Sequence, residues 1–130
     1  MQLDEYRTLG RSGLRVSPLA LGTMSFGDPS WGSDAETSSD IIARYLDAGG
    51  NFIDTANGYS EGDSERIIGD YLTKRPGLRD RVVISTKFAR NMFPGDPNGG
   101  GSGRKAVLQQ VDASLERLGV EYIDLYWQHC

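Results

Sequence analysis

Short apolar runs alternate along the chain with longer segments in which apolar residues recur every three or four positions. The runs are rich in β-branched and aromatic residues and are typical of strands, whereas the recurring stripes are typical of amphipathic helices. Glycines at both ends of the turn 10–13 predict a β-hairpin over 6–16. Strands are then predicted at 19–22, 51–55, 82–87 and 122–127, and helices at 33–48, from 63 or 64 to 75, and at 104–118.

The helices have recognisable ends and faces. Ser33 and Glu36 have the spacing of a capping box at the start of the first helix, and Gly49 is suited to end it. Asp63 or Ser64 is the expected cap of the second helix. The predicted apolar faces are Ile41, Ile42, Tyr45 and Leu46 in the first helix, Ile67, Ile68, Tyr71 and Leu72 in the second, and Val107, Leu108, Val111, Leu115 and Leu118 in the third.

Strands that alternate with amphipathic helices predict a parallel sheet with right-handed crossovers. Two α/β architectures fit this order: an open doubly wound sheet and part of a (β/α)8 TIM barrel. An open nucleotide-binding sheet usually has the pattern G-x-G-x-x-G after its first strand, whereas the segment 22–27 reads GTMSFG. The barrel is therefore favoured. The run 19–22 is apolar throughout, so this strand is expected to be buried on both faces.

The composition is that of an ordinary folded domain. The 130 residues include 14 Lys and Arg and 18 Asp and Glu, which gives a net charge of −4, so we expect no basic face for DNA or RNA. No apolar run approaches the ~20 residues of a membrane helix, and the first residues lack the features of a signal peptide. The one cysteine, Cys130, can build neither a disulfide framework nor a thiolate metal site. We therefore expect one cytoplasmic domain over 1–130 with no metal, membrane or nucleic-acid partner.

Four polar side chains lie at or just after the ends of successive predicted strands: Asp54, Tyr59, Lys87 and His129. In a parallel barrel the carboxyl ends of the strands share one rim, where catalytic groups lie. Each residue also has a simpler interpretation, with Asp54 as a turn cap, Tyr59 as a packing residue, Lys87 as a surface charge and His129 as part of a frayed end. The combination of a carboxylate, a phenol, an ammonium and an imidazole on one rim favours a catalytic site.

These groups have complementary chemistry. A phenol is a poor proton donor at neutral pH, but an ammonium about 4 Å away would favour its ionised form by roughly 4 kcal/mol at an effective dielectric of 20, before the opposing cost of desolvation. Asp54 would hold Lys87 in place, and His129 would donate a hydrogen bond to a substrate oxygen. A carbonyl between Tyr59 and His129 would then be ready to accept a hydride, which no side chain supplies, so a cofactor is required.

Four motifs resemble those of the aldo-keto reductases: YRTLG at 6–10, LALGTM at 19–24, NFIDTANGY at 51–59 and STK at 85–87. The resemblance covers essentially the whole chain, and the branch is similar to the one that contains bacterial reductases and potassium-channel β subunits. It implies a (β/α)8 barrel that reduces small aldehydes and ketones with NADP(H).

The resemblance also implies a role for each residue that matches the family's motifs. Tyr59 is the general acid, and Lys87 assists its ionisation. Asp54 pairs with Lys87, and His129 positions the substrate carbonyl.

Further contacts follow from the same resemblance. Gly22, Thr23, Met24 and Asp54 match the part of the family that lies against the nicotinamide end of the cofactor. Trp31, in the loop after the first strand, is expected to wall the substrate pocket together with the tyrosine and histidine.

The chain departs from the family in length. A family barrel has eight strands, so the predicted hairpin, four strands and three helices amount to an N-terminal half barrel. Most of the family's contacts to the phosphates and adenine of NADP would then be missing. A half barrel also leaves its first and fourth strands as open edges and its apolar faces uncovered. We expect either a truncated reductase with little activity by itself, or a non-catalytic module that self-associates or binds a complementary C-terminal half.

Two other segments have a structural interpretation. The glycine-rich stretch 98–103 resembles a phosphate cradle or a flexible linker, but its position between a strand end and a helix start favours a mobile active-site loop. Asp112, Glu116, Arg117 and Glu121 are interpreted as a solvated helix face with its flank.

Overall fold

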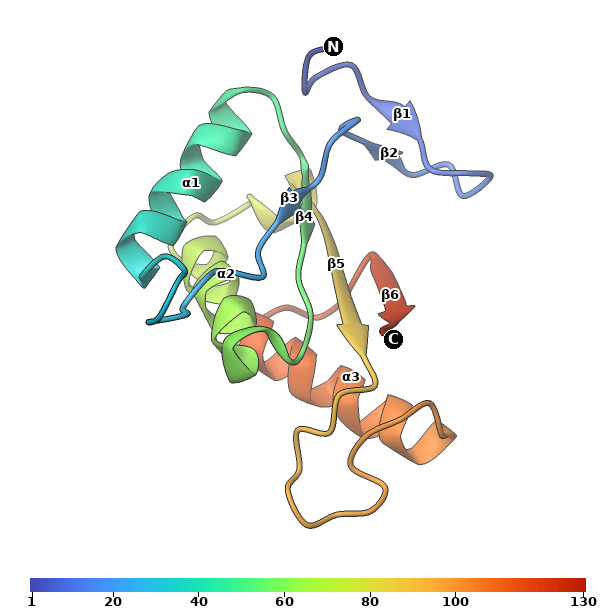
Figure 1. Cartoon of the computed structure of the whole chain (residues 1–130). Helices are drawn as coiled ribbons and strands as arrows, with labels where there is room; N and C mark the ends of the chain where they lie inside the picture. Colours follow the sequence, from blue (N-terminus) through green and yellow to red (C-terminus); the bar gives the residue numbers. More distant parts are fainter.

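The computed structural model describes all 130 residues and contains a short antiparallel hairpin and a four-stranded parallel sheet (Figure 1). The hairpin pairs β1 (Arg7–Thr8) with β2 (Arg15–Val16). The parallel sheet has the order β3 (Leu21–Gly22), β4 (Phe52–Asp54), β5 (Val83–Phe88) and β6 (Leu125–Gln128). The helices are α1 (Ala35–Asp47), α2 (Asp63–Thr73) and α3 (Arg104–Leu118), with 3-10 turns η1 (Tyr59–Gly62) and η2 (Arg79–Arg81).

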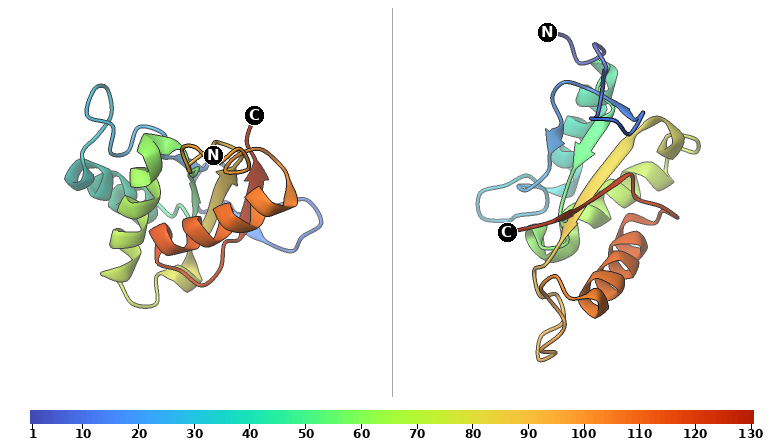
Figure 2. Two further views of the ribbon diagram at one scale, coloured as in Figure 1. Left: turned by 90° about the horizontal axis from the view of Figure 1, so that it is seen from below. Right: turned by 90° about the vertical axis from the view of Figure 1, so that its right-hand side faces the viewer.

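The order of elements confirms the predicted topology. Each strand pairs with the next one along the chain, and a helix makes each crossover between parallel neighbours. The helices lie together on one side of the sheet, and the opposite side carries no helix (Figure 2). This is the architecture of part of a (β/α)8 barrel, with β3 and β6 as the outer strands.

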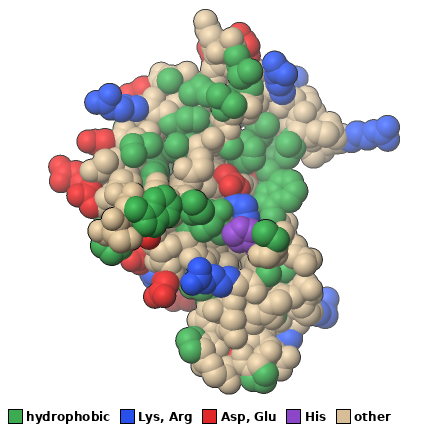
Figure 3. All heavy atoms as spheres, viewed as in Figure 1, with side chains coloured by type: hydrophobic (Ala, Val, Ile, Leu, Met, Phe, Trp, Pro, Cys, Tyr) green, Lys and Arg blue, Asp and Glu red, His purple; other side chains and the backbone are tan.

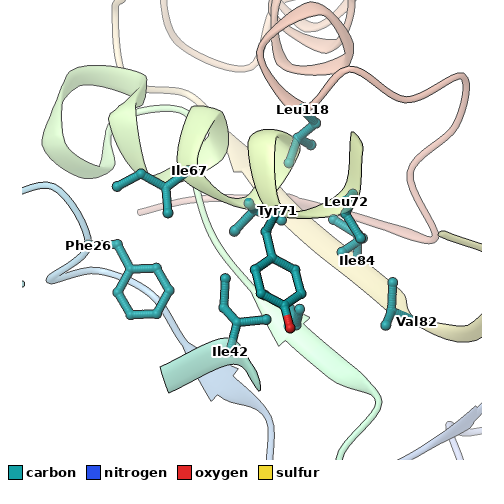
Figure 4. Packing of buried hydrophobic residues seen from close by; sticks show 10 residues of the cluster. Phe26, Ile42, Ile67, Tyr71, Leu72, Val82, Ile84 and Leu118 are labelled. Atoms are coloured by element: carbon teal, nitrogen blue, oxygen red, sulfur yellow. The ribbon is translucent and has the colours of Figure 1, made fainter. Parts of the chain in front are cut away.

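The hydrophobic core lies between the sheet and the helices. The predicted apolar face of α2 is buried there, and Ile42 and Phe26 pack against it from α1 and from the loop after β3 (Figure 4). The cluster consists of Phe26, Ile42, Ile53, Ile67, Ile68, Tyr71, Leu72, Val82, Ile84 and Leu118.

The caps of the first two helices differ from the prediction. Asp34 rather than Ser33 caps α1: its Oδ1 accepts a hydrogen bond from the Thr37 backbone N–H at 2.8 Å, which lowers the pKa of Asp34. The Ser33 hydroxyl instead forms a hydrogen bond with that of Ser38 at 2.8 Å. The N-cap of α2 is Gly62, with φ +96°. The Ser64 hydroxyl, a predicted cap, instead donates a hydrogen bond to the Thr23 carbonyl oxygen.

The strand predicted over 19–22 is shorter and less buried than expected. β3 contains only Leu21 and Gly22, and Leu19 is 58% exposed. The prediction of burial on both faces was wrong because only one side of the sheet is covered by helices.

The buried face of α3 is also not the predicted one. Only Leu118 of the predicted stripe is buried, and Leu108 is 49% exposed. Apart from Leu118, the inward residues are small or polar, since α3 lies so close to α2 that a Cβ on Gly69 would be 2.7 Å from the carbonyl oxygens of Arg117 and Leu118 in α3. The inward residues are Ala106, Gln110, Ser114 and Leu118.

One predicted surface charge is an interior ion pair. The Arg117 side chain is 12% exposed, and its Nε lies 2.6 Å from Oε2 of the fully buried Glu65 on α2. Thr86 of β5 donates a hydrogen bond to the other carboxylate oxygen at 2.6 Å. The network therefore joins α2, α3 and β5, and the interpretation of Arg117 as part of a solvated face was wrong.

Candidate active site

The parallel sheet brings the predicted polar residues to one edge. Asp54 is the last residue of β4, and Lys87 lies near the end of the adjacent strand β5. Tyr59 begins the 3-10 turn after β4, and His129 follows β6 directly. Because the strands are parallel and in register, their carboxyl ends meet at the same edge.

The Lys87 ammonium is the centre of the cluster. It donates hydrogen bonds to Asp54 Oδ2 at 2.6 Å, to the Thr55 carbonyl oxygen at 2.8 Å and to Tyr59 Oη at 3.4 Å. An ammonium has three N–H donors, so each has a partner within the protein. With Lys87 and Asp54 only 16% and 27% exposed, this ion pair is poorly screened by solvent and fixes the amine beside the phenol.

A serine that the sequence analysis missed holds the other oxygen of the carboxylate. Ser85 lies opposite Asp54 in the β4–β5 register and donates a hydrogen bond to Asp54 Oδ1. Ser85 and Lys87 are two residues apart on one strand, so they point to the same face of the sheet. The period of the strand was the signal that would have placed this serine beside the lysine.

Tyr59 and His129 face each other across the opening. Their ring centroids are 5.8 Å apart at an interplanar angle of 78°, an edge-on arrangement. The backbone N–H of His129 donates to the Phe88 carbonyl at 2.9 Å, which ties this residue to β5. After Tyr59 the backbone is left-handed at Ser60 and Glu61, with φ +46° and +53°. The Ser60 hydroxyl donates a hydrogen bond to the Phe26 carbonyl oxygen at 2.7 Å, which fixes this turn. The prediction that the four groups gather at one rim is consistent with this geometry.

An open depression of about 670 Å³ adjoins Asp54, Lys87 and His129 on the side of the sheet without helices, whereas Tyr59 is not part of its lining. In Figure 3 the only histidine of the chain lies at the surface beside a basic and an acidic side chain, with apolar groups around them. The depression is lined by Ala20, Gly22, Phe52, Asp54, Lys87, Trp127, Gln128, His129 and Cys130.

The remaining predicted contact residues lie at the end of β3 and in the loop after it. Thr23 is fully buried, and both its backbone N–H and its hydroxyl donate to the Asp54 carbonyl, at 3.1 and 3.0 Å. Its side chain therefore supports the end of β4. Met24 and Trp31 are 54% and 61% exposed, and Gly22 borders the depression with open space where a Cβ would be.

The lining of the depression fits one end of a nicotinamide cofactor better than the whole molecule. The missing Cβ of Gly22 and the flat rings of Phe52 and Trp127 suit a planar ring. Phosphates favour cationic partners, but Lys87 is the only cation in the lining and its donors already have partners. The residues present therefore fit the reacting ring and offer little to the phosphates.

No helix of the structure combines the length and apolar character that a membrane span needs.

The glycine-rich loop lies close to the site. In the glycine-rich segment 98–103, the Gly101 N–H donates to the Ala89 carbonyl at 2.7 Å, so this loop returns to the end of β5 close to the lysine.

Comparison with known proteins confirms the predicted family. The aldo/keto reductase family model matches residues 18–130. The chain is 42% identical to norsolorinic acid reductase of Aspergillus flavus and 38% identical to an aryl-alcohol dehydrogenase of Pestalotiopsis microspora, in each case over 98% of this chain and 35% of the relative. It is also 38% identical to a putative aryl-alcohol dehydrogenase of Saccharomyces cerevisiae, over 98% of this chain and 65% of the relative. The chain thus spans about a third of the length of the first two relatives, and it belongs to the aldo/keto reductase family.

Proposed function

We propose that this chain carries the catalytic groups of an NADPH-dependent carbonyl reductase that acts on aromatic aldehydes or ketones. The observation that supports it best is the Lys87 ammonium between the Asp54 carboxylate and the Tyr59 hydroxyl, with the His129 ring opposite. The preference for aromatic substrates is taken from the names of the two aryl-alcohol dehydrogenases among the relatives.

In the proposed reaction the side chains act on the carbonyl oxygen. The imidazole of His129 donates a hydrogen bond that orients the carbonyl, and the Tyr59 hydroxyl donates the proton that turns the oxygen into an alcohol. Lys87 stabilises the phenolate that remains, and Asp54 holds the ammonium in place. Bound NADPH supplies the hydride for the carbonyl carbon.

The nicotinamide end of the cofactor would be held by Gly22, Met24 and Asp54, with the fully buried Thr23 supporting the end of β4 behind them. Because the depression offers the phosphates no free cation, we expect the 130-residue chain by itself to bind NADPH weakly and to have little activity.

The test of this function uses a hybrid in which residues 1–130 replace the matching segment of an aryl-alcohol dehydrogenase. The hybrid should oxidise NADPH in the presence of an aromatic aldehyde. Tyr59→Phe should lower kcat by about 100-fold or more, since general acid catalysis has that magnitude. The control is Tyr6→Phe, which removes a hydroxyl bonded to the Gly49 carbonyl, away from the cluster. Equal turnover of the two variants would refute the role of Tyr59.

A second function is favoured by one observation, the uncovered side of the sheet with the half-exposed Trp127 on its outer strand. Here the chain would act as an interaction module that binds a second copy or a polypeptide with the complementary strands. Light scattering of the purified chain tests this alternative. A stable, monodisperse monomer that adds no mass when a complementary half is supplied would exclude it.

A further inference from the structure

Two buried amides connect α3 with the loop that carries Tyr59. Asn57 is 0% exposed and Gln110 is 1% exposed. The Asn57 side-chain amide donates to Gln110 Oε1 at 2.7 Å, although the residues are 53 positions apart in the sequence. Asn57 precedes the tyrosine by two residues, so the bond fixes the backbone from which the phenol projects.

The same oxygen of Gln110 also holds the end of β5. It accepts a hydrogen bond from the backbone N–H of Ala89 at 3.0 Å, two residues after Lys87. Ala89 has φ +110°, a conformation that a residue with a side chain rarely adopts. Such strain persists only where the surroundings hold it, and the bond from Gln110 is part of what holds it.

Two further hydrogen bonds join the tyrosine loop and β5 directly. The Asn57 backbone N–H donates to the Lys87 carbonyl at 3.0 Å, and its side chain donates to the Arg90 carbonyl at 3.2 Å. The Arg90 side chain packs where a Cβ on Gly58 would lie. Both segments that supply the phenol and the ammonium are therefore fastened to one another and to Gln110.

Helix packing alone does not require this pair. Asn57 Oδ1 and Gln110 Nε2 are buried without a hydrogen-bond partner, which carries a free-energy cost. An apolar side chain at either position would avoid that cost. The presence of the two amides is explained by the hydrogen bonds that they do make, to one another and to the backbone of Ala89 and Arg90 after β5.

We propose that Gln110 and Asn57 are positioning residues that set the distance between the Tyr59 hydroxyl and the Lys87 ammonium. Neither residue lines the depression, so each acts through the backbone that it holds. Their part in catalysis rests on the proposed reductase function, whereas their part in the geometry does not.

The experiment compares two neighbouring glutamines on the same helix in the full chain. Gln110→Met keeps the length of the side chain and removes the acceptor. Gln109→Met is the matched control, because the Gln109 Oε1 has no partner. Amide hydrogen exchange and the nuclear Overhauser effect between the Tyr59 and His129 rings are measured in both variants.

Gln110→Met should speed exchange at the Ala89 and Asn57 amides by about tenfold relative to Gln109→Met and weaken the ring contact. Exchange at Ile53, in the core of β4, should change equally in both variants. Asn57→Asp removes the donor to Gln110 and should loosen the same two amides, which gives a second reading if Gln110→Met does not fold. Adding Gln110→Met to Asn57→Asp should weaken the ring contact little further.

Equal exchange at Ala89 in the two methionine variants would overturn the proposal, and so would a change that spreads evenly to Ile53. Neither readout depends on turnover. A hybrid enzyme in which Tyr59→Phe stays active would refute the proposed function and leave the positioning result unaffected.

Discussion

Removal of the Arg117 side chain is the sharpest test of how the helices are fastened to the sheet. Its Nε is 2.6 Å from Oε2 of Glu65, and the carboxylate is fully buried. Thr86 provides its other hydrogen bond. Arg117→Met keeps most of the apolar stem and leaves the carboxylate without a cation.

The magnitude follows from the burial of the pair. Breaking a buried ion pair by removing one partner costs about 3–5 kcal/mol, because an uncompensated charge remains inside. The chain supplies a matched control in Arg66→Met, which breaks the pair with Asp63 at 2.9 Å, where both side chains are more than half exposed. An exposed pair contributes at most about 1 kcal/mol. The two substitutions should therefore differ by about 2–4 kcal/mol in the free energy of unfolding.

Urea denaturation followed by circular dichroism measures this difference. With a slope of about 1–3 kcal/mol per molar urea, Arg117→Met should lower the midpoint by about 2 M and Arg66→Met by well under 1 M. Glu65→Gln combined with Arg117→Met should be more stable than Arg117→Met alone, since the buried charge is gone. Equal midpoints for Arg117→Met and Arg66→Met would refute the reasoning. So would a loss of unfolding free energy in the double variant that equals the sum of the losses from Glu65→Gln and Arg117→Met.

Three other predictions concern helix packing, helix capping and cofactor binding. Gly69→Ala should lower the free energy of unfolding by about 1–3 kcal/mol in a denaturant titration. The new Cβ would lie 2.7 Å from two carbonyl oxygens of α3, and this clash outweighs the ~1 kcal/mol gain in helix propensity. A more stable variant would contradict the observed packing. The stabilising effect of Asp34 should be fully present above the unfolded-state pKa of 3.8 and should disappear as pH falls through the lower pKa of the folded state. Asp34→Ala should therefore reduce Tm at neutral pH and have no effect on Tm at strongly acidic pH. An equal loss of Tm at both pH values would count against this cap. Calorimetric titration of the 130-residue chain with NADPH should show binding weaker than micromolar, and micromolar binding would contradict the incomplete phosphate site.

The elements and their order could be predicted from the sequence because each depends on local pattern. The apolar face of α2 was predicted correctly, since Ile67, Ile68, Tyr71 and Leu72 all face the sheet at helical spacing. The gathering of Asp54 and Lys87 follows from topology alone, because the carboxyl ends of neighbouring parallel strands share an edge.

The errors on the buried face of α3 and on Arg117 come from contacts between distant segments. The buried face of α3 depends on how closely it approaches Gly69, which its own periodicity does not encode. Arg117 resembles a surface charge until Glu65 is placed opposite it, 52 positions earlier. The same holds for Gln110, which has no marker in the sequence that links it to Asn57.

The central claim is that side chains from separate strand ends meet around one opening, and the single histidine of the chain allows it to be tested directly. Its ring protons give unique signals, and their nuclear Overhauser contacts can be measured in the full chain. With ring centroids 5.8 Å apart, His129 should show a contact to a tyrosine ring that disappears in Tyr59→Leu and persists in Tyr6→Leu. A folded chain without that contact, or with the contact intact in Tyr59→Leu, would contradict the proposed active site.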